Sequence, residues 1–157
     1  MKSNVVLSKY AFTLTLVFTI VLVVCCVLTF NEKPVFWAVL AILLLLLVCG
    51  LLYGPVAITA DSEFITVNSC LSRKRISVSE IENVQLFQPT MGAYRLFASG
   101  GFFGYWGIFR EGDIGKYTAY YGKASDCFIL RMKNGNKYVL GCKNPNEMVA
   151  YIQNQIK

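Results

Sequence analysis

The chain has 157 residues, 55% of them hydrophobic, and its 15 lysines and arginines exceed its 9 acidic residues, giving a net charge of +6. It contains no histidine, which excludes histidine-based acid–base catalysis and the Ser-His-Asp triad. The excess of basic residues is small, so nucleic acid is not an expected partner.

Two uncharged apolar segments, residues 11–30 and 35–53, are separated only by Asn31-Glu32-Lys33-Pro34. As helices, at about 1.5 Å per residue, each is roughly 30 Å long, which matches the hydrocarbon core of a bilayer. The first segment is longer than the core of a secretory signal, and no small-x-small cleavage site follows it. We therefore predict a two-helix transmembrane anchor over residues 1–53, followed by one domain over residues 54–157.

The anchor has a predicted orientation. Lys2 and Lys9 precede the first segment without any acidic residue, whereas Glu32 and Lys33 cancel in the loop. Positive flanks favour the cytoplasm, so the N-terminus and residues 54–157 are both expected there. Neither segment contains an ionisable residue, which favours an anchor over a transporter or channel.

The six cysteines predict neither a disulfide framework nor a metal site. Cys25, Cys26 and Cys49 lie inside the apolar segments, while the remaining three are scattered over residues 70–142. Without histidine or a CxxC motif they make a poor zinc ligand set. Gly100-Gly101 is not followed by the Lys-Ser/Thr of a phosphate loop. We expect no cofactor, no metal and no enzymatic activity.

Residues 54–157 predict an antiparallel β-barrel or sandwich closed by a C-terminal helix. Strand-like segments cover residues 55–60, 64–71, 76–78, 81–87, 127–132 and 137–141. Asn134-Gly135 predicts a tight hairpin between the last two. A helix is predicted over residues 145–157, with Asn144 as the N-cap, Pro145 at its first position and Glu147 completing a capping box. Residues 73–75 are expected in a solvated turn.

The middle of the domain is rich in glycine and aromatic residues, and eight of the twelve glycines fall between residues 92 and 122. Aromatic side chains packed over glycines are a device of curved sheets, so we expect these residues to bend and fill the β fold. As an alternative, the uncharged segment 96–109 dips among lipid headgroups, with Trp106 as the candidate contact.

Residues 76–84 (ISVSEIENV), and Arg95 followed by residues 100–107 (GGFFGYWG), resemble bacterial pleckstrin-homology-like (PH) domains. The resemblance is to the small membrane-anchored type common in Bacteroidetes and covers roughly residues 55–157. It implies a seven-stranded, partly open barrel capped by the C-terminal helix, in an interaction or assembly module of the bacterial inner membrane. Phosphoinositide binding is not implied, because the first hairpin loop, Asp61-Ser62-Glu63, is acidic.

The sequence leaves three functions open. The leading hypothesis is a non-enzymatic module at the cytoplasmic face that binds a protein partner or self-associates. The alternative is a sensor of anionic lipid headgroups that uses the basic cluster Arg73, Lys74 and Arg75. The third is an accessory subunit whose two helices pack against a larger membrane complex.

Overall fold

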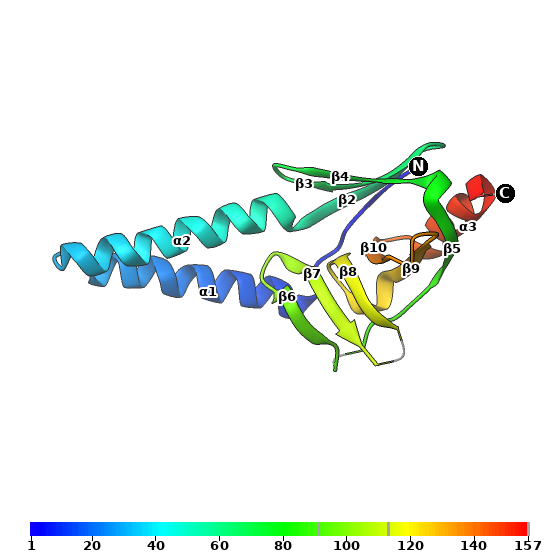
Figure 1. The fold of residues 1–157 in the computed structure, drawn as a ribbon. Helices are drawn as coiled ribbons and strands as arrows, with labels where there is room; N and C mark the ends of the chain where they lie inside the picture. The colour runs from blue at the N-terminus through cyan, green and yellow to red at the C-terminus, as the bar shows by residue number, and fades with distance from the viewer. Residues whose placement is uncertain (91, 113, 157) are drawn as a thin grey trace.

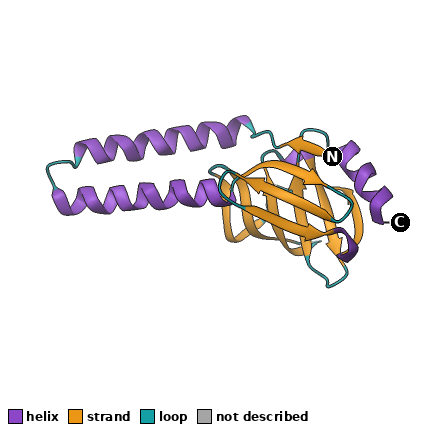
Figure 2. Ribbon diagram, turned by 90° about the horizontal axis from the view of Figure 1, so that it is seen from above, coloured by secondary structure: helices purple, strands orange, loops and turns teal. Residues whose placement is uncertain are grey.

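The computed structural model describes residues 1–90, 92–112 and 114–156. Two long helices, α1 (Lys9–Leu28) and α2 (Lys33–Tyr53), form a hairpin that projects from one end of a β domain (Figures 1 and 2). Ser8 caps α1 by accepting a hydrogen bond from the amide of Ala11, and Pro34 lies in the first turn of α2. Both helices are long and apolar enough to cross a membrane, and most of their side chains are exposed.

The described residues form ten strands in two sheets that face each other as a sandwich (Figure 2). The four-stranded sheet has the order β1-β2-β3-β4 and the six-stranded sheet the order β5-β9-β10-β8-β7-β6. The first comprises β1 (Lys2–Asn4), β2 (Pro55–Ala60), β3 (Phe64–Ser69) and β4 (Arg73–Ser77). The second comprises β5 (Ile81–Leu86), β6 (Tyr94–Gly101), β7 (Gly104–Glu111), β8 (Gly115–Tyr121), β9 (Cys127–Met132) and β10 (Lys137–Gly141).

The sandwich differs from the predicted fold in three details. It contains more strands than the implied seven. One strand pair, β8 with β10, is parallel, so the six-stranded sheet is mixed rather than antiparallel. Residues 73–75 belong to strand β4 and not to a turn, because they pair with residues 66–68 of β3.

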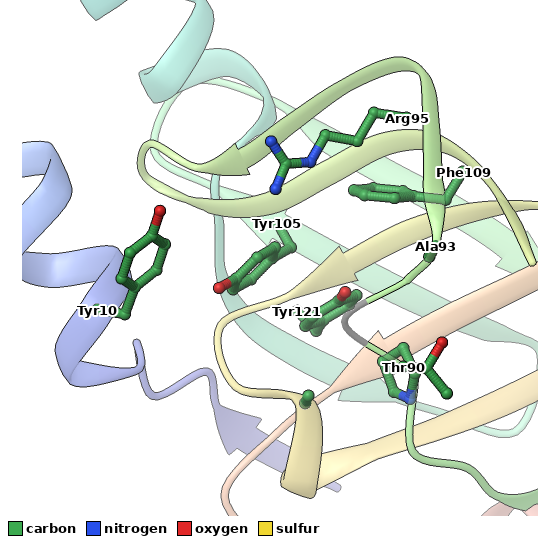
Figure 3. A pocket seen from close by; sticks show the side chains of 9 residues that line it. Tyr10, Thr90, Ala93, Arg95, Tyr105, Phe109 and Tyr121 are labelled. Carbon is green, nitrogen blue, oxygen red and sulfur yellow. The ribbon is translucent and has the colours of Figure 1, made fainter.

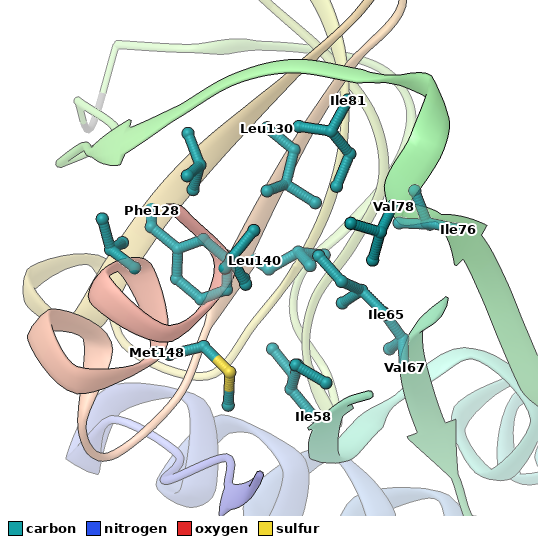
Figure 4. Packing of buried hydrophobic residues seen from close by; sticks show 14 of the residues in the cluster. Ile58, Ile65, Val67, Ile76, Val78, Ile81, Phe128, Leu130, Leu140 and Met148 are labelled. Carbon is teal, nitrogen blue, oxygen red and sulfur yellow. The ribbon is translucent and has the colours of Figure 1, made fainter. Parts of the chain in front are cut away.

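The main core lies between the two sheets, and the C-terminal helix α3 (Pro145–Ile156) closes it. Ile58, Ile65 and Val67 come from the four-stranded sheet and meet Phe128 and Leu130 of the six-stranded sheet (Figure 4). Met148, Val149 and Ile152 of α3 are buried in the same cluster. The apolar stripe of this helix therefore closes the sandwich as predicted. At the start of the helix, the Nδ2 of Asn144 donates to a carboxylate oxygen of Glu147 at 3.3 Å.

Residues 1–8, here called the N-terminal segment, are part of the β domain although they precede α1. Strand β1 pairs antiparallel with β2, and the segment continues with a hydrogen bond from the amide of Val5 to Val56 O at 2.8 Å. Two further bonds reach residues next to the second sheet, beyond the ends of β8 and β10: the amide of Ser8 donates to Gly122 O at 2.8 Å, and Asn4 O accepts from the amide of Lys143 at 2.9 Å. The segment therefore bridges the two sheets before the chain enters α1.

Candidate functional site

Basic side chains from two distant parts of the sequence meet on the outer face of the four-stranded sheet. The register places Lys2 opposite Thr59, Thr59 opposite Thr66, and Thr66 opposite Arg75. Arg73 lies opposite Asn68, in the next row on the same face. Since side chains two residues apart on a strand share a face, this register aligns Lys2, Arg73 and Arg75. We call this surface the basic face.

The basic face is polar, shallow and open. The Nδ2 of Asn68 donates to Thr59 at 3.0 Å, and the guanidinium of Arg75 lies 6.0 Å from the centre of the Phe64 ring. A groove of about 300 Å³ runs across the face and is lined by Lys2, Thr59, Asp61, Thr66, Asn68, Arg73 and Arg75. Within the described part of the chain, none of its three cations pairs with a carboxylate at 4.0 Å or less. Its charge is therefore available to a ligand.

The structure separates the three basic residues that the sequence presented as one cluster. Lys74 lies opposite Val67, a core residue, and so belongs to the opposite side of the sheet from Arg73 and Arg75. All three side chains are exposed, because β4 is an edge strand of its sheet. Lys2 takes the third position on the basic face, which no local pattern in the sequence indicated.

One end of the basic face touches the helical hairpin. The turn between β3 and β4 lies on the last turn of α2, where the amide of Leu71 donates to Leu51 O at 3.1 Å. The hydroxyl of Ser72 donates to Leu52 O in the same turn. Arg73 therefore lies beside the end of α2, and the groove extends from there away from the hairpin.

A second contact fixes the hairpin to the six-stranded sheet. The β6–β7 turn, residues 101–104, lies against both helices, with Phe103 packed on Gly50 of α2. The hydroxyl of Thr15 accepts from the amide of Phe103 at 2.9 Å and lies 3.3 Å from Gly101 O. Phe102 meets Phe18 of α1 edge to face at 6.0 Å. In Figure 1 the two helices diverge toward the domain, and this turn lies at their diverging ends.

Segment 96–109 is partly buried and partly exposed. Leu96 and Phe97 of β6 are exposed, the latter by 80%, whereas Phe109 of β7 is 2% exposed. Trp106 lies at the helix junction: its ring stacks on Tyr53 of α2 at 5.3 Å, and its Nε1 donates to Phe102 O at 3.0 Å. Trp106 is thus held against α2, and it does not line the groove of the basic face.

The tyrosines and thiols of the domain are arranged for packing. Tyr121 stacks on Tyr105 at 4.9 Å, and together with Arg95 they line a small cavity of about 100 Å³ (Figure 3). Burial raises the pKa of the Tyr121 hydroxyl above its usual range. It also raises the pKa of the Cys127 thiol, so this buried thiol stays protonated and is a poor nucleophile. The described residues contain no cluster of three or more metal-ligating side chains.

A model of the Bacterial PH domain family matches residues 56–156. The match leaves out strand β1 and both long helices, which this chain adds in front of the shared domain. No curated protein and no solved structure matches the chain.

Proposed function

The chain belongs to the bacterial PH domain family, and on that premise we propose that it is a membrane-anchored, non-enzymatic interaction module. Its helices α1 and α2 act as the anchor, and its basic face binds an acidic surface of a protein partner or of a second copy. The proposal covers a partner in the same membrane, for which this chain acts as an accessory subunit.

The observation that carries the proposal is the alignment of Lys2, Arg73 and Arg75, none of which forms an ion pair with a carboxylate of the described residues. Three cations aligned on one side of a sheet repel one another, and Asp61, a carboxylate that lines their groove, forms no ion pair with them at 4.0 Å or less, which supports a binding role for this face. The four-stranded sheet that carries this face runs away from the end of α2 (Figure 1), and a neighbouring membrane protein would bind along it. A groove lined by hydroxyl and amide groups adds hydrogen-bond partners for a peptide.

Charge variants of the full-length protein test this function. We expect Arg73→Ala with Arg75→Ala to lose the partner, or the homo-oligomer, that co-purifies with the wild type from gently solubilised membranes. The control is Arg110→Ala with Arg131→Ala, which removes the same charge from exposed strand positions of the other sheet. Equal recovery with both double variants would contradict the proposed role of the basic face.

A second candidate, anionic lipid headgroups, is favoured by the place of Arg73 beside the last turn of α2. At the end of a membrane span, a basic side chain gains about 1 kcal/mol from an anionic surface. For this function the full-length protein in nanodiscs should bind added vesicles of anionic lipid and not neutral ones, and the binding should weaken at high salt. Vesicle binding that is unchanged by Arg73→Ala with Arg75→Ala would count against it.

The proposed side of the membrane is the cytoplasmic one, in the bacterial inner membrane. Cys70, in the β3–β4 turn, is exposed, whereas Cys127 and Cys142 are buried. A membrane-impermeant maleimide should therefore label the protein in lysed but not in intact spheroplasts, and Cys70→Ser should abolish the labelling. Labelling of Cys70 in intact spheroplasts would place the domain on the outer side.

A further inference from the structure

An apolar groove of about 410 Å³ lies where the helical hairpin meets the β domain, and it is separate from the basic face. Leu14 and Phe18 of α1 form one wall and Leu46 and Cys49 of α2 another. The third wall is the β6–β7 hairpin, including Phe97, Phe102 and Trp106. Apart from Ser99, whose hydroxyl already donates to Phe102 O, the lining side chains are apolar.

The depth of this groove determines what can fill it. Phe18 lies nine residues after Lys9, the first residue of α1, which is about 14 Å along the helix axis. If α1 and α2 cross the membrane, as the proposed function requires, the deep end of the groove is at the level of the acyl chains. Water is unfavourable against such walls, and a hydrocarbon chain is the ligand that matches them.

A cation lies next to the groove, on the other face of the edge strand β6, where it lines the small cavity with Tyr105 and Phe109. Arg95, on the same strand β6 as Phe97, extends its guanidinium along the strand and packs over Gly100 (Figure 3). Its side chain lines the neighbouring small cavity together with Tyr10, the second residue of α1. Tyr10 marks the level at which α1 leaves the apolar layer, and phosphate groups of a bilayer lie at that level. Arginine is suited to binding phosphate through paired N–H donors.

We propose that this groove is a binding site for one phospholipid of the surrounding bilayer, with an acyl chain between α1, α2 and β6 and the phosphate at Arg95. The bound lipid fills the junction between the anchor and the domain. The inference rests on α1 and α2 being the membrane anchor and does not involve the basic face.

The experiment uses the two tryptophans of the chain. In full-length protein carrying Trp37→Phe, Trp106 in the groove wall is the remaining fluorophore. We expect detergent-solubilised protein, titrated with a phospholipid brominated on one acyl chain, to show saturable quenching at one lipid per chain. Leu46→Phe, which fills the groove, should abolish this quenching. Leu45→Phe, the same change at a position 63% exposed on α2, should leave it intact.

The phosphate contact is tested separately with Arg95→Gln and, as the matched control, Arg110→Gln. We expect Arg95→Gln alone to weaken quenching by the brominated phospholipid, while quenching by a brominated fatty-acid methyl ester stays unchanged. Quenching that does not saturate, or that is the same in Leu46→Phe and Leu45→Phe, would overturn the site. Equal responses of the two arginine variants would overturn the phosphate contact. A dimer in the same detergent that persists in saturating lipid and dissociates with Leu46→Phe would assign the groove to a second copy instead.

Discussion

Replacing Gly122 with alanine is expected to destabilise the protein by about 2–3 kcal/mol. A Cβ at this position would overlap the carbonyl oxygen of Val6 in the N-terminal segment, so the segment has to move away. The move breaks the hydrogen bond from the amide of Ser8 to Gly122 O, and it pulls on β1, which pairs with β2. The N-terminal segment would therefore separate from the six-stranded sheet first at Ser8, its end next to α1.

The matched control is Gly112→Ala, because a Cβ at Gly112 meets no atom of the described residues within 4 Å. Thermal unfolding of both full-length variants in the same detergent measures the difference, and Gly112→Ala should unfold close to the wild type. Equal unfolding temperatures for the two variants would show that the N-terminal segment is not packed on Gly122.

Thr15→Val is expected to destabilise the helix–domain junction by about 1–3 kcal/mol, because it leaves a half-buried amide without a partner. Valine has the shape of threonine but no hydroxyl, so the amide of Phe103 loses its acceptor. Because the β6–β7 turn makes its contact with α1 through this hydroxyl and through Phe102 on Phe18, the loss should loosen the turn. The effect is local, since the core between the sheets lies elsewhere.

The control for this change is Thr19→Val, one turn further along α1, whose hydroxyl donates within the helix, to Thr15 O at 2.7 Å. Hydrogen exchange of the Phe103 amide in full-length protein is the most direct measurement. Exchange should accelerate in Thr15→Val and stay slow in Thr19→Val. Slow exchange in both variants would mean that the hydroxyl of Thr15 does not hold the turn.

Patterns local in the sequence predicted the elements that form locally. The two apolar segments became α1 and α2, and Asn134-Gly135 joins β9 to β10 as a tight turn. The capping residues before α3 placed its start at Pro145. In each case the signal, whether length, turn chemistry or a cap, lies within the element itself.

The sequence could not reveal the pairings between distant segments. Strand β1 has three residues and no alternation of apolar and polar side chains strong enough to predict a strand, and it forms because β2 offers an open edge. Residues 73–75 lack apolar alternation as well, and pairing with β3 makes them a strand. The basic face depends on both pairings, so its composition became visible only with the register of the four strands.

The placement of segment 96–109 also depends on contacts with residues distant in the sequence. Its glycines were expected to bend the sheet, and Gly101 and Gly104, both with positive φ, do flank the tight β6–β7 turn. What the composition could not indicate is that this turn packs on the helices rather than on the core. Thr15 and Gly50, the residues that receive it, look like ordinary members of apolar helices.

Photo-crosslinking on the basic face tests the central claim most directly. A photoreactive amino acid replaces Thr66, which lies between Thr59 and Arg75 on this face, in the full-length protein in its native membrane. We predict one discrete protein adduct at this position, which disappears with Arg73→Ala and Arg75→Ala and is absent when the probe replaces the exposed Glu82 of β5. No adduct at Thr66, or the same adduct after removal of both arginines, would contradict binding of a protein partner at the basic face.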